Sequence, residues 1–253
     1  MFMDGVVDSR TAYMLGPYPG TVETGSPLFE PDRFKDICTE IDRRGLQIAV
    51  HAIGDGAVRQ TIDGYEAARR RNGARDSRHR IEHIELIDRV DVPRLGALGI
   101  TASLQPPHAP GVMDFPLSGM ETVIARDRWV DAYQWKSLVD GGAALAYASD
   151  WPVTDVSVMR GIQAALTRMP FEGAADERLG LMDTLRAYTA GGAWAAHLEG
   201  LTGTLREGLM ADLVLIDGDI EAIPAGQIGA TGIALTVVGG RVTHAAAGFG
   251  GKG

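Results

Sequence analysis

The sequence is poor in cysteine and lysine and has no long hydrophobic run. Cys38 is the only cysteine among 253 residues, so no internal disulfide can form, and a reducing compartment such as the cytoplasm is expected. No apolar run reaches the ~20 residues that a membrane-spanning helix needs, and the first residues lack the pattern of a signal peptide. These absences predict a cytoplasmic protein without a membrane partner.

Positive charge is also scarce. Lysine and arginine total 24 against 33 acidic residues, which gives a net charge of −9. A chain with this balance has no general attraction for nucleic acid or anionic lipid, so neither is expected as a partner. Hydrophobic residues make up 45% and charged residues 23% of the chain, as in an ordinary globular protein with a sizeable core in one or two domains.

Strand-like apolar segments alternate with helical patterns over most of the chain. The expected strands are 46–52, 80–86, 100–106 and 144–150, and the expected helices are 31–44, 55–73, 90–98, 128–141, 156–168 and 180–196. Strands separated by helices indicate an α/β fold with a parallel sheet. After about residue 200 the pattern changes to short strands with glycine turns, including a hairpin at Gly239-Gly240. Segment 107–125 is expected to be a long loop that serves as a lid.

Polar residues stand at the ends of three expected strands. His51 ends the apolar run in "LQIAVHAIGDGAV", His83 follows in "RIEHIEL", and Asp150 closes "YASD". Parallel strands present their carboxyl ends at one edge of a sheet, so the three side chains are expected to meet there. Two imidazoles and a carboxylate suit zinc, with a position left open for water. Such an ion lowers the pKa of water to about 7, and Asp150 could instead serve as the general base.

Each of these residues also has a structural alternative. His51 could be a half-buried histidine bonded to backbone, His83 could be held at the surface by neighbouring acids, and Asp150 could simply turn the chain. Asp55 fits an N-cap. His108 lies in the long loop, where a surface histidine is the default and contact with substrate the alternative. Three candidates at successive strand ends nevertheless favour a common site.

Four motifs occur in a fixed order, "VHAIGD", "HRIEHIEL", "SLQPPH" and "YASDWPV". Together with "FMDGVVDSRTAYML" near the start and "GTLREGLMADLVLIDGD" near the end, they resemble the second half of amidohydrolase-superfamily enzymes, in the branch that includes N-substituted formamide deformylases. The resemblance implies a distorted (β/α)8 barrel with a small β-sandwich, a divalent metal such as zinc and a small amide-type substrate. The resemblance implies that His51, His83 and Asp150 are metal ligands and that Asp150 accepts the proton of the attacking water. It also makes His108 and Trp151 candidates for substrate contact.

The chain departs from the family pattern in what it lacks. It has no His-x-His pair, which the family carries on its first strand, and the branch's lysine would fall one position before Met1. Four expected barrel strands stand where the family has eight. The fold class expected is therefore α/β, with residues 1–198 as the C-terminal half of a TIM-like barrel and residues 199–253 as part of the β-sandwich.

The expected function is metal-dependent hydrolysis of a non-peptide C–N bond, amide or formamide-like, by activated water. Residues 1–253 alone are expected to be inactive, because half a barrel leaves sheet edges and core uncovered. Association with a separate N-terminal half, or with a second copy of the chain, would cover them. The alternative is a noncatalytic α/β interaction module that retains part of the metal site.

Overall fold

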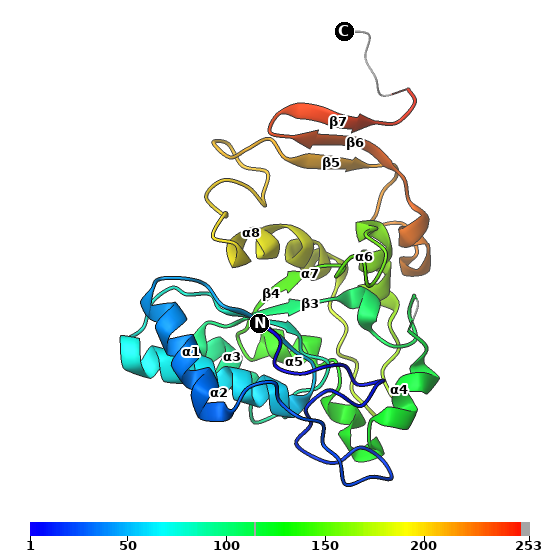
Figure 1. Ribbon diagram of the computed structural model, residues 1–253. Helices are drawn as coiled ribbons and strands as arrows, with labels where there is room; N and C mark the ends of the chain where they lie inside the picture. Colours follow the sequence, from blue (N-terminus) through cyan, green and yellow to red (C-terminus); the bar gives the residue numbers. More distant parts are fainter. Residues whose placement is uncertain (114, 249–253) are drawn as a thin grey trace.

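Two separate sheets organise the molecule, whose computed structural model describes residues 1–113 and 115–248 (Figure 1). The first is parallel with strand order β1-β2-β3-β4, and the second is antiparallel with order β5-β6-β7. The strands are β1 (Ala49–Ala52), β2 (Arg80–His83), β3 (Thr101–Leu104), β4 (Ala144–Tyr147), β5 (Leu213–Ile216), β6 (Ile233–Val238) and β7 (Arg241–Ala245). The α/β prediction with its parallel sheet is confirmed.

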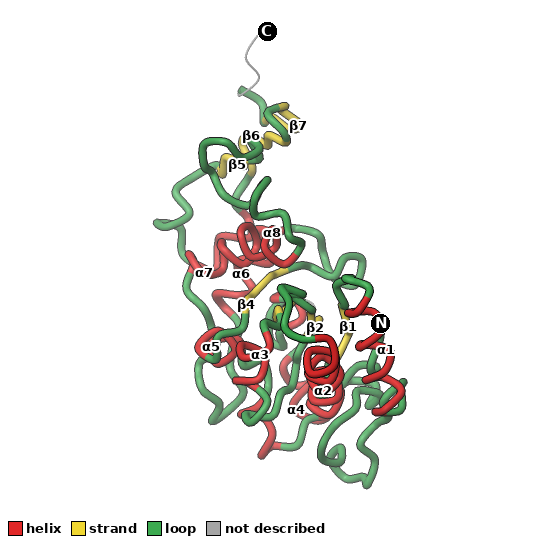
Figure 2. The backbone as a smooth tube through the Cα atoms, turned by 90° about the vertical axis from the view of Figure 1, so that its left-hand side faces the viewer, coloured by secondary structure: helices red, strands yellow, loops and turns green. Residues whose placement is uncertain are grey.

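Helices precede, separate and follow the strands of the parallel sheet. They are α1 (Pro31–Arg43), α2 (Asp55–Asn72), α3 (Val92–Leu98), α4 (Leu117–Val123), α5 (Trp135–Asp140), α6 (Val158–Thr167), α7 (Leu181–Arg186) and α8 (Gly192–Ala195). Each strand pairs with the next one along the chain, so the connections all advance in one direction across the sheet. Figures 1 and 2 show α6, α7 and α8 between the parallel sheet and the small sheet.

Burial explains why the strands form where they do. All four residues of β3 are buried, as expected for a strand covered on both faces. The first helix packs closely on the second: Phe34 and Cys38 of α1 face Gly64 of α2, where an added Cβ would lie 2.5 Å from the Phe34 ring. Gly64 therefore permits the close approach of the two helices.

The first three residues extend the parallel sheet beyond β1. The His51 amide donates to the Met1 carbonyl at 2.9 Å, and the Met3 amide donates to the His51 carbonyl at 2.8 Å. Phe2 thereby forms a parallel bridge with His51. The segment after this bridge begins with Asp4, which is buried next to the end of β1.

Two expectations about local structure are wrong. Segment 107–125 is not a plain loop, because it begins within the 3-10 turn η1 (Pro106–His108) and contains α4. The single helix expected over 128–141 is split into the 3-10 segment η2 (Arg126–Asp131) and α5. The split occurs at Tyr133, whose φ of 50° is left-handed and whose amide donates to the Glu85 carbonyl at 2.8 Å. A long-range bond to the residues after β2 therefore replaces the helical one.

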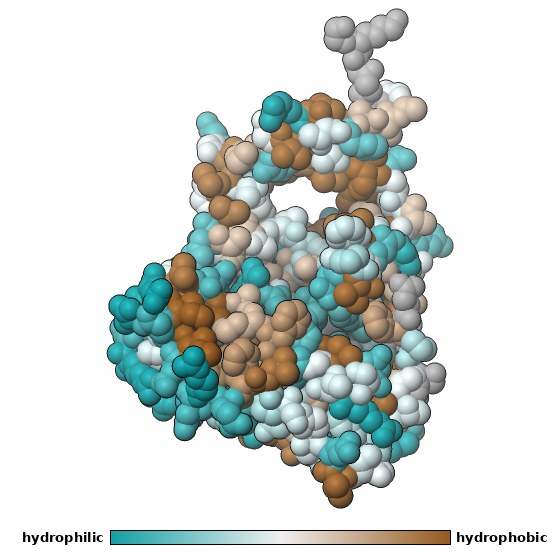
Figure 3. Space-filling model, viewed as in Figure 1, coloured by the Kyte–Doolittle hydropathy of each residue, from teal (hydrophilic) through white to brown (hydrophobic). Residues whose placement is uncertain are grey.

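The small sheet is mostly exposed. Its hairpin turns at Gly239-Gly240, as predicted, and both glycines have positive φ. Val214, Leu215 and Val242 are largely open to solvent, and Figure 3 shows an opening between this sheet and the rest of the molecule. Among the residues that the structure describes, no helix is both long enough and apolar enough to cross a membrane.

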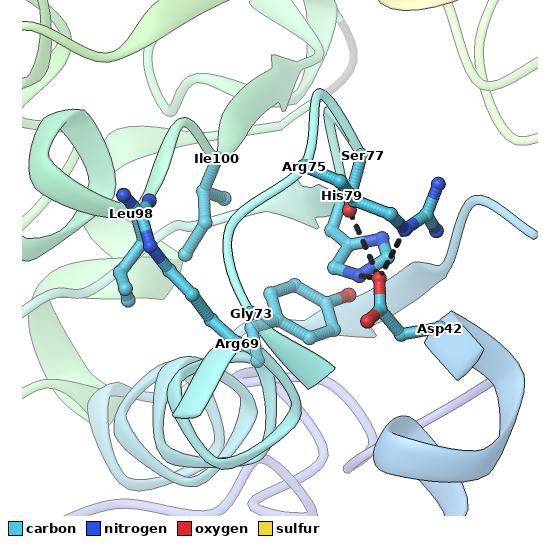
Figure 4. Close-up of a pocket in the computed structure, with 9 residues that line it drawn as sticks. Asp42, Arg69, Gly73, Arg75, Ser77, His79, Leu98 and Ile100 are labelled. Carbon is cyan, nitrogen blue, oxygen red and sulfur yellow. Dashed lines mark hydrogen bonds and ion pairs between the residues drawn. The ribbon is translucent and has the colours of Figure 1, made fainter. Parts of the chain in front are cut away.

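The amino-terminal edge of the parallel sheet holds a paired polar cluster (Figure 4). The Asp42 carboxylate, at the end of α1, accepts hydrogen bonds from the side chains of Asn72, Arg75 and Ser77. His79, just before β2, has its Nε2 at 3.2 Å from Asp42 Oδ1, and its Nδ1 accepts a bond from the Ile48 amide at 3.1 Å. This narrow cavity is lined by groups that already have partners, so it serves to join α1, α2 and the strand entries.

Candidate metal centre

Four chemically active side chains follow the four parallel strands. His51 is the third residue of β1, His83 is the last residue of β2, His108 closes the turn η1 after β3, and Asp150 comes three residues after β4. Local backbone turns aim two of them: His83 and Asp150 have φ values of 76° and 60°. His83 thus leaves the extended conformation at the last residue of β2, and Asp150 does so three residues after β4.

Three of these side chains form a compact cluster. His83, His108 and Asp150 each offer a ligand atom, and these atoms lie within 4.8 Å of one another. His108 Nε2 is 3.6 Å from Asp150 Oδ2, and the rings of His83 and His108 stack at 5.5 Å. His51 lies beside this cluster, with its ring 4.5 Å from that of His83, but none of its ligand atoms belongs to the compact set.

Unpaired nitrogens mark this edge of the sheet. His51 Nδ1, His83 Nδ1 and His108 Nε2 are buried and form no hydrogen bond with any part of the chain that the structure describes. Most buried polar atoms in proteins have a partner, and leaving one unpaired costs about 1–3 kcal/mol. Neutral imidazole nitrogens of this kind are the donors that Zn²⁺ binds. The residues present therefore fit a divalent metal.

Burial keeps His83 neutral. Desolvation, reinforced by the positive charge that His51 and His108 can carry, lowers the pKa of His83 from 6.5 to about 3. A metal ligand must be deprotonated, and His83 meets that requirement throughout the neutral range without an ion to displace its proton.

His108 is not the surface histidine that its loop position suggested. It is 7% exposed, and the Phe115 ring lies 5.3 Å from its own. Its Nδ1 is 3.8 Å from Glu85 Oε1, so Glu85 and Asp150 lie on either side of the imidazole. The turn η1 brings His108 inward, and the sequence signal for this was Pro106-Pro107 directly before it. Trp151, in contrast, is 67% exposed at the rim.

Asp4 is a residue of this region that the strand-end pattern did not reveal. Its carboxylate accepts hydrogen bonds from the amides of Tyr13, Ile53 and Gly54, and its Oδ1 lies 3.4 Å from His51 Nδ1. Asp4 thus holds the turn that follows β1. Its only signal in the sequence was the "DG" of the opening motif.

Asp55 does not cap α2, contrary to expectation. Gly54 occupies the N-cap, and Asp55 is the fully buried first residue of the helix. Its carboxylate accepts a hydrogen bond from the Leu15 amide at 2.9 Å and forms an ion pair with Arg128. Asp55 therefore ties the segments before α1 and after α4 to the start of α2.

A parallel α/β sheet with imidazoles and a carboxylate at its carboxyl edge is typical of metal-dependent hydrolases. The family model described as "Amidohydrolase family" matches residues 1–244. The chain belongs to this family, and the resemblance drawn from its motifs is confirmed.

Named relatives agree with this assignment. The chain is 34% identical over 220 residues to Protein LONG AFTER FAR-RED 3 of Arabidopsis thaliana, covering 85% of this chain and 37% of that protein. It is 29% identical to the putative amidohydrolase YtcJ of Bacillus subtilis, covering 96% and 46%. It is 26% identical to the N-substituted formamide deformylase of Arthrobacter pascens, covering 85% and 40%.

Solved structures show the same fold. An uncharacterized metal-dependent hydrolase from Pyrococcus horikoshii OT3 matches with a TM-score of 0.76 and 26% identity, covering 89% of this chain and 45% of that one. One from Pyrococcus furiosus matches with a TM-score of 0.71 and 28% identity, covering 83% and 42%. The chain thus spans less than half the length of each of these five relatives.

Proposed function

We propose that this chain carries part of the active site of an enzyme that hydrolyses a non-peptide C–N bond, amide or formamide-like, with a divalent metal such as zinc. The observation that supports this proposal is the cluster of His83, His108 and Asp150 with its unpaired imidazole nitrogens. Membership in the amidohydrolase family and the name of the Arthrobacter deformylase point to the same bond type.

The proposed roles follow from position and charge. His51, His83 and Asp150 would hold the ion, with His108 able to replace His51 as a ligand or to contact the substrate. When bound, the ion would lower the pKa of water to about 7 and polarise the substrate carbonyl. Asp150 would take the proton of the attacking water and pass it to the leaving nitrogen. Its side chain is 38% exposed, which lets a substrate reach the carboxylate.

A half barrel is the arrangement that we infer for the enzyme part. The strand order β1-β2-β3-β4 is that of consecutive barrel strands, and the relatives are more than twice as long as the matched segment. Residues 1–198 would form the barrel half and residues 199–253 the sandwich segment. A separate N-terminal half, or a second copy of the chain, would then complete the sheet beyond residues 1–3, which pair with β1, and at β4.

Metal analysis and activity together test the proposal. Residues 1–253 and a protein extended by the upstream half of a relative would be loaded with Zn²⁺, dialysed, and analysed by mass spectrometry and on a panel of amides and formamides. We expect weak metal retention and negligible turnover from the short chain, and retained metal with measurable hydrolysis from the extended protein. In the latter, Asp150→Asn should abolish turnover because an amide cannot accept the water proton.

Matched variants separate the site from general effects. In the extended protein, His83→Ala should abolish metal retention. His244→Ala, which changes an exposed histidine of β7, should not. Robust hydrolysis by a monomer of residues 1–253 would refute the half-barrel proposal. An extended protein that retains metal but hydrolyses no amide would refute the reaction class and support the noncatalytic alternative.

A further inference from the structure

A second cavity lies between two segments that the proposed reaction does not use. Its volume is about 240 Å³, and its apolar lining includes Met14, Pro17 and Tyr18 on one wall and Val123 and Ala125 on the other. An engineered apolar cavity of about 150 Å³ is large enough to bind benzene. This cavity therefore has room for one aromatic ring.

Both walls are attached to the carboxyl edge of the parallel sheet. The Leu15 amide donates to the Asp55 carboxylate, four residues after His51. On the other wall, the Asp131 carbonyl accepts from the Ile87 amide at 3.1 Å, four residues after His83. The cavity is thus built from segments that are hydrogen-bonded close to the ends of β1 and β2, where His51 and His83 lie.

Helix α4 connects the cavity with the metal centre. Phe115, just before α4, places its ring 5.3 Å from that of His108, and Val123, the last residue of α4, lines the cavity. Seven helical residues span about 10 Å. A ligand that reaches both places must therefore be extended, with its ring separated from its reacting group.

The charges at the cavity favour a neutral aromatic group. Arg128 lines the cavity and is paired with Asp55 and Asp131, while the exposed Asp127 adds negative charge at the rim. Arg128 Nη1 makes no hydrogen bond with the described residues and faces Gly16, where an added Cβ would lie 3.8 Å away. A guanidinium edge over an apolar space suits an aromatic face, and the surrounding carboxylates disfavour an anion.

We propose that this cavity binds the aromatic end of an extended, uncharged amide substrate. The proposal rests on the proposed function for the identity of the reacting group, and it deepens that function by naming the substrate class. The ring would occupy the space between Tyr18 and Ala125, and the amide would extend along α4 towards His108.

Calorimetric titration of the metal-free chain tests the cavity without relying on activity. The probes are 4-phenylbutanamide and butanamide, which share the amide and differ in the ring. Burial of a phenyl ring should make the first bind about 10- to 100-fold more tightly. Ala125→Phe and Gly16→Leu, which place a side chain in the cavity from opposite walls, should each reduce this ratio to near one. Ala222→Phe, at an exposed turn residue, should leave it unchanged.

The outcomes distinguish this proposal from the proposed function. Equal affinity for the two probes, or a ratio that survives both cavity-filling variants, would overturn the aromatic subsite. Metal retention is measured on the same samples. If the chain prefers the phenyl probe but retains no metal, even in the extended protein, the aromatic subsite is supported and the proposed hydrolase function is refuted. Metal retention without ring selectivity keeps the hydrolase and refutes the subsite.

Discussion

Protonation of His79 should make the chain less stable below neutral pH. His79 is buried at the amino-terminal edge of the sheet, and desolvation lowers its pKa from 6.5 to about 4 although Asp42 lies 3.2 Å away. Between these two values the unfolded chain binds a proton that the folded chain does not, so stability falls as pH falls. The two pKa values correspond to a loss of about 2 kcal/mol in the free energy of unfolding between pH 7 and pH 5.

Urea unfolding of wild type and His79→Gln at both pH values measures this loss. The amide of Gln can still accept from Ile48 and donate to Asp42, so the variant should fold and should lose about 2 kcal/mol less than wild type. Wild type must be compared with the variant because His83, whose pKa is lowered to about 3, also makes the folded chain less stable as pH falls. His244→Gln on exposed β7 serves as the control and should behave like wild type. The same loss in His79→Gln as in wild type would refute the linkage to His79.

Three further changes probe packing and burial. Gly64→Ala should lower the free energy of unfolding by about 1–3 kcal/mol, despite the better helix propensity of alanine, because the new Cβ would lie 2.5 Å from the Phe34 ring. Urea unfolding measures this change, and an unchanged urea midpoint would contradict the close packing of α1 on α2. Asp4→Ala leaves three backbone amides without their acceptor and should cost about 3 kcal/mol, with faster hydrogen exchange at those amides and not elsewhere. Burial and nearby Asp42 raise the pKa of Cys38 to about 12, so its thiol should resist alkylation at pH 8 until the chain is unfolded, and rapid labelling of the native chain would be inconsistent with its burial.

The sheet was predictable because its information is local. Apolar runs flanked by amphipathic helices gave the four strands in order, and the histidines at their ends followed from the same pattern. The strands themselves are shorter than expected: β2 ends at His83 because His83 and Ile84 both take positive φ. The Ile84 amide donates to the Ala52 carbonyl at 3.2 Å, and the periodicity of the strand contains no sign of this backbone reversal.

Long-range bonds account for what the sequence did not predict. The break at Tyr133 depends on a carbonyl that lies 48 residues earlier in the chain, at Glu85. Asp4 acquires its role from the amides of Ile53 and Gly54, nearly 50 residues away. Neither partner can be read from local propensity, because the tertiary arrangement decides which backbone groups remain to be paired.

Pairing of buried imidazoles distinguishes the two edges of the sheet and leads to a last prediction. His79 Nδ1 accepts from the Ile48 amide and its Nε2 lies 3.2 Å from Asp42. His51 Nδ1 forms no hydrogen bond with the described residues, and the Asp4 oxygen 3.4 Å away already accepts from the Ile53 amide. His79→Leu should therefore lower the free energy of unfolding by about 1–3 kcal/mol, because it leaves the Ile48 amide and an Asp42 oxygen unpaired. His51→Leu removes a nitrogen without a hydrogen bond and leaves Asp4 its three backbone amide donors, so the metal-free chain should be as stable as wild type or more stable. Urea unfolding at pH 7 with a chelator measures both variants. If both variants are destabilised equally, the proposed difference between His79 and His51 is refuted, because the His51 nitrogen would then contribute to the stability of the metal-free chain.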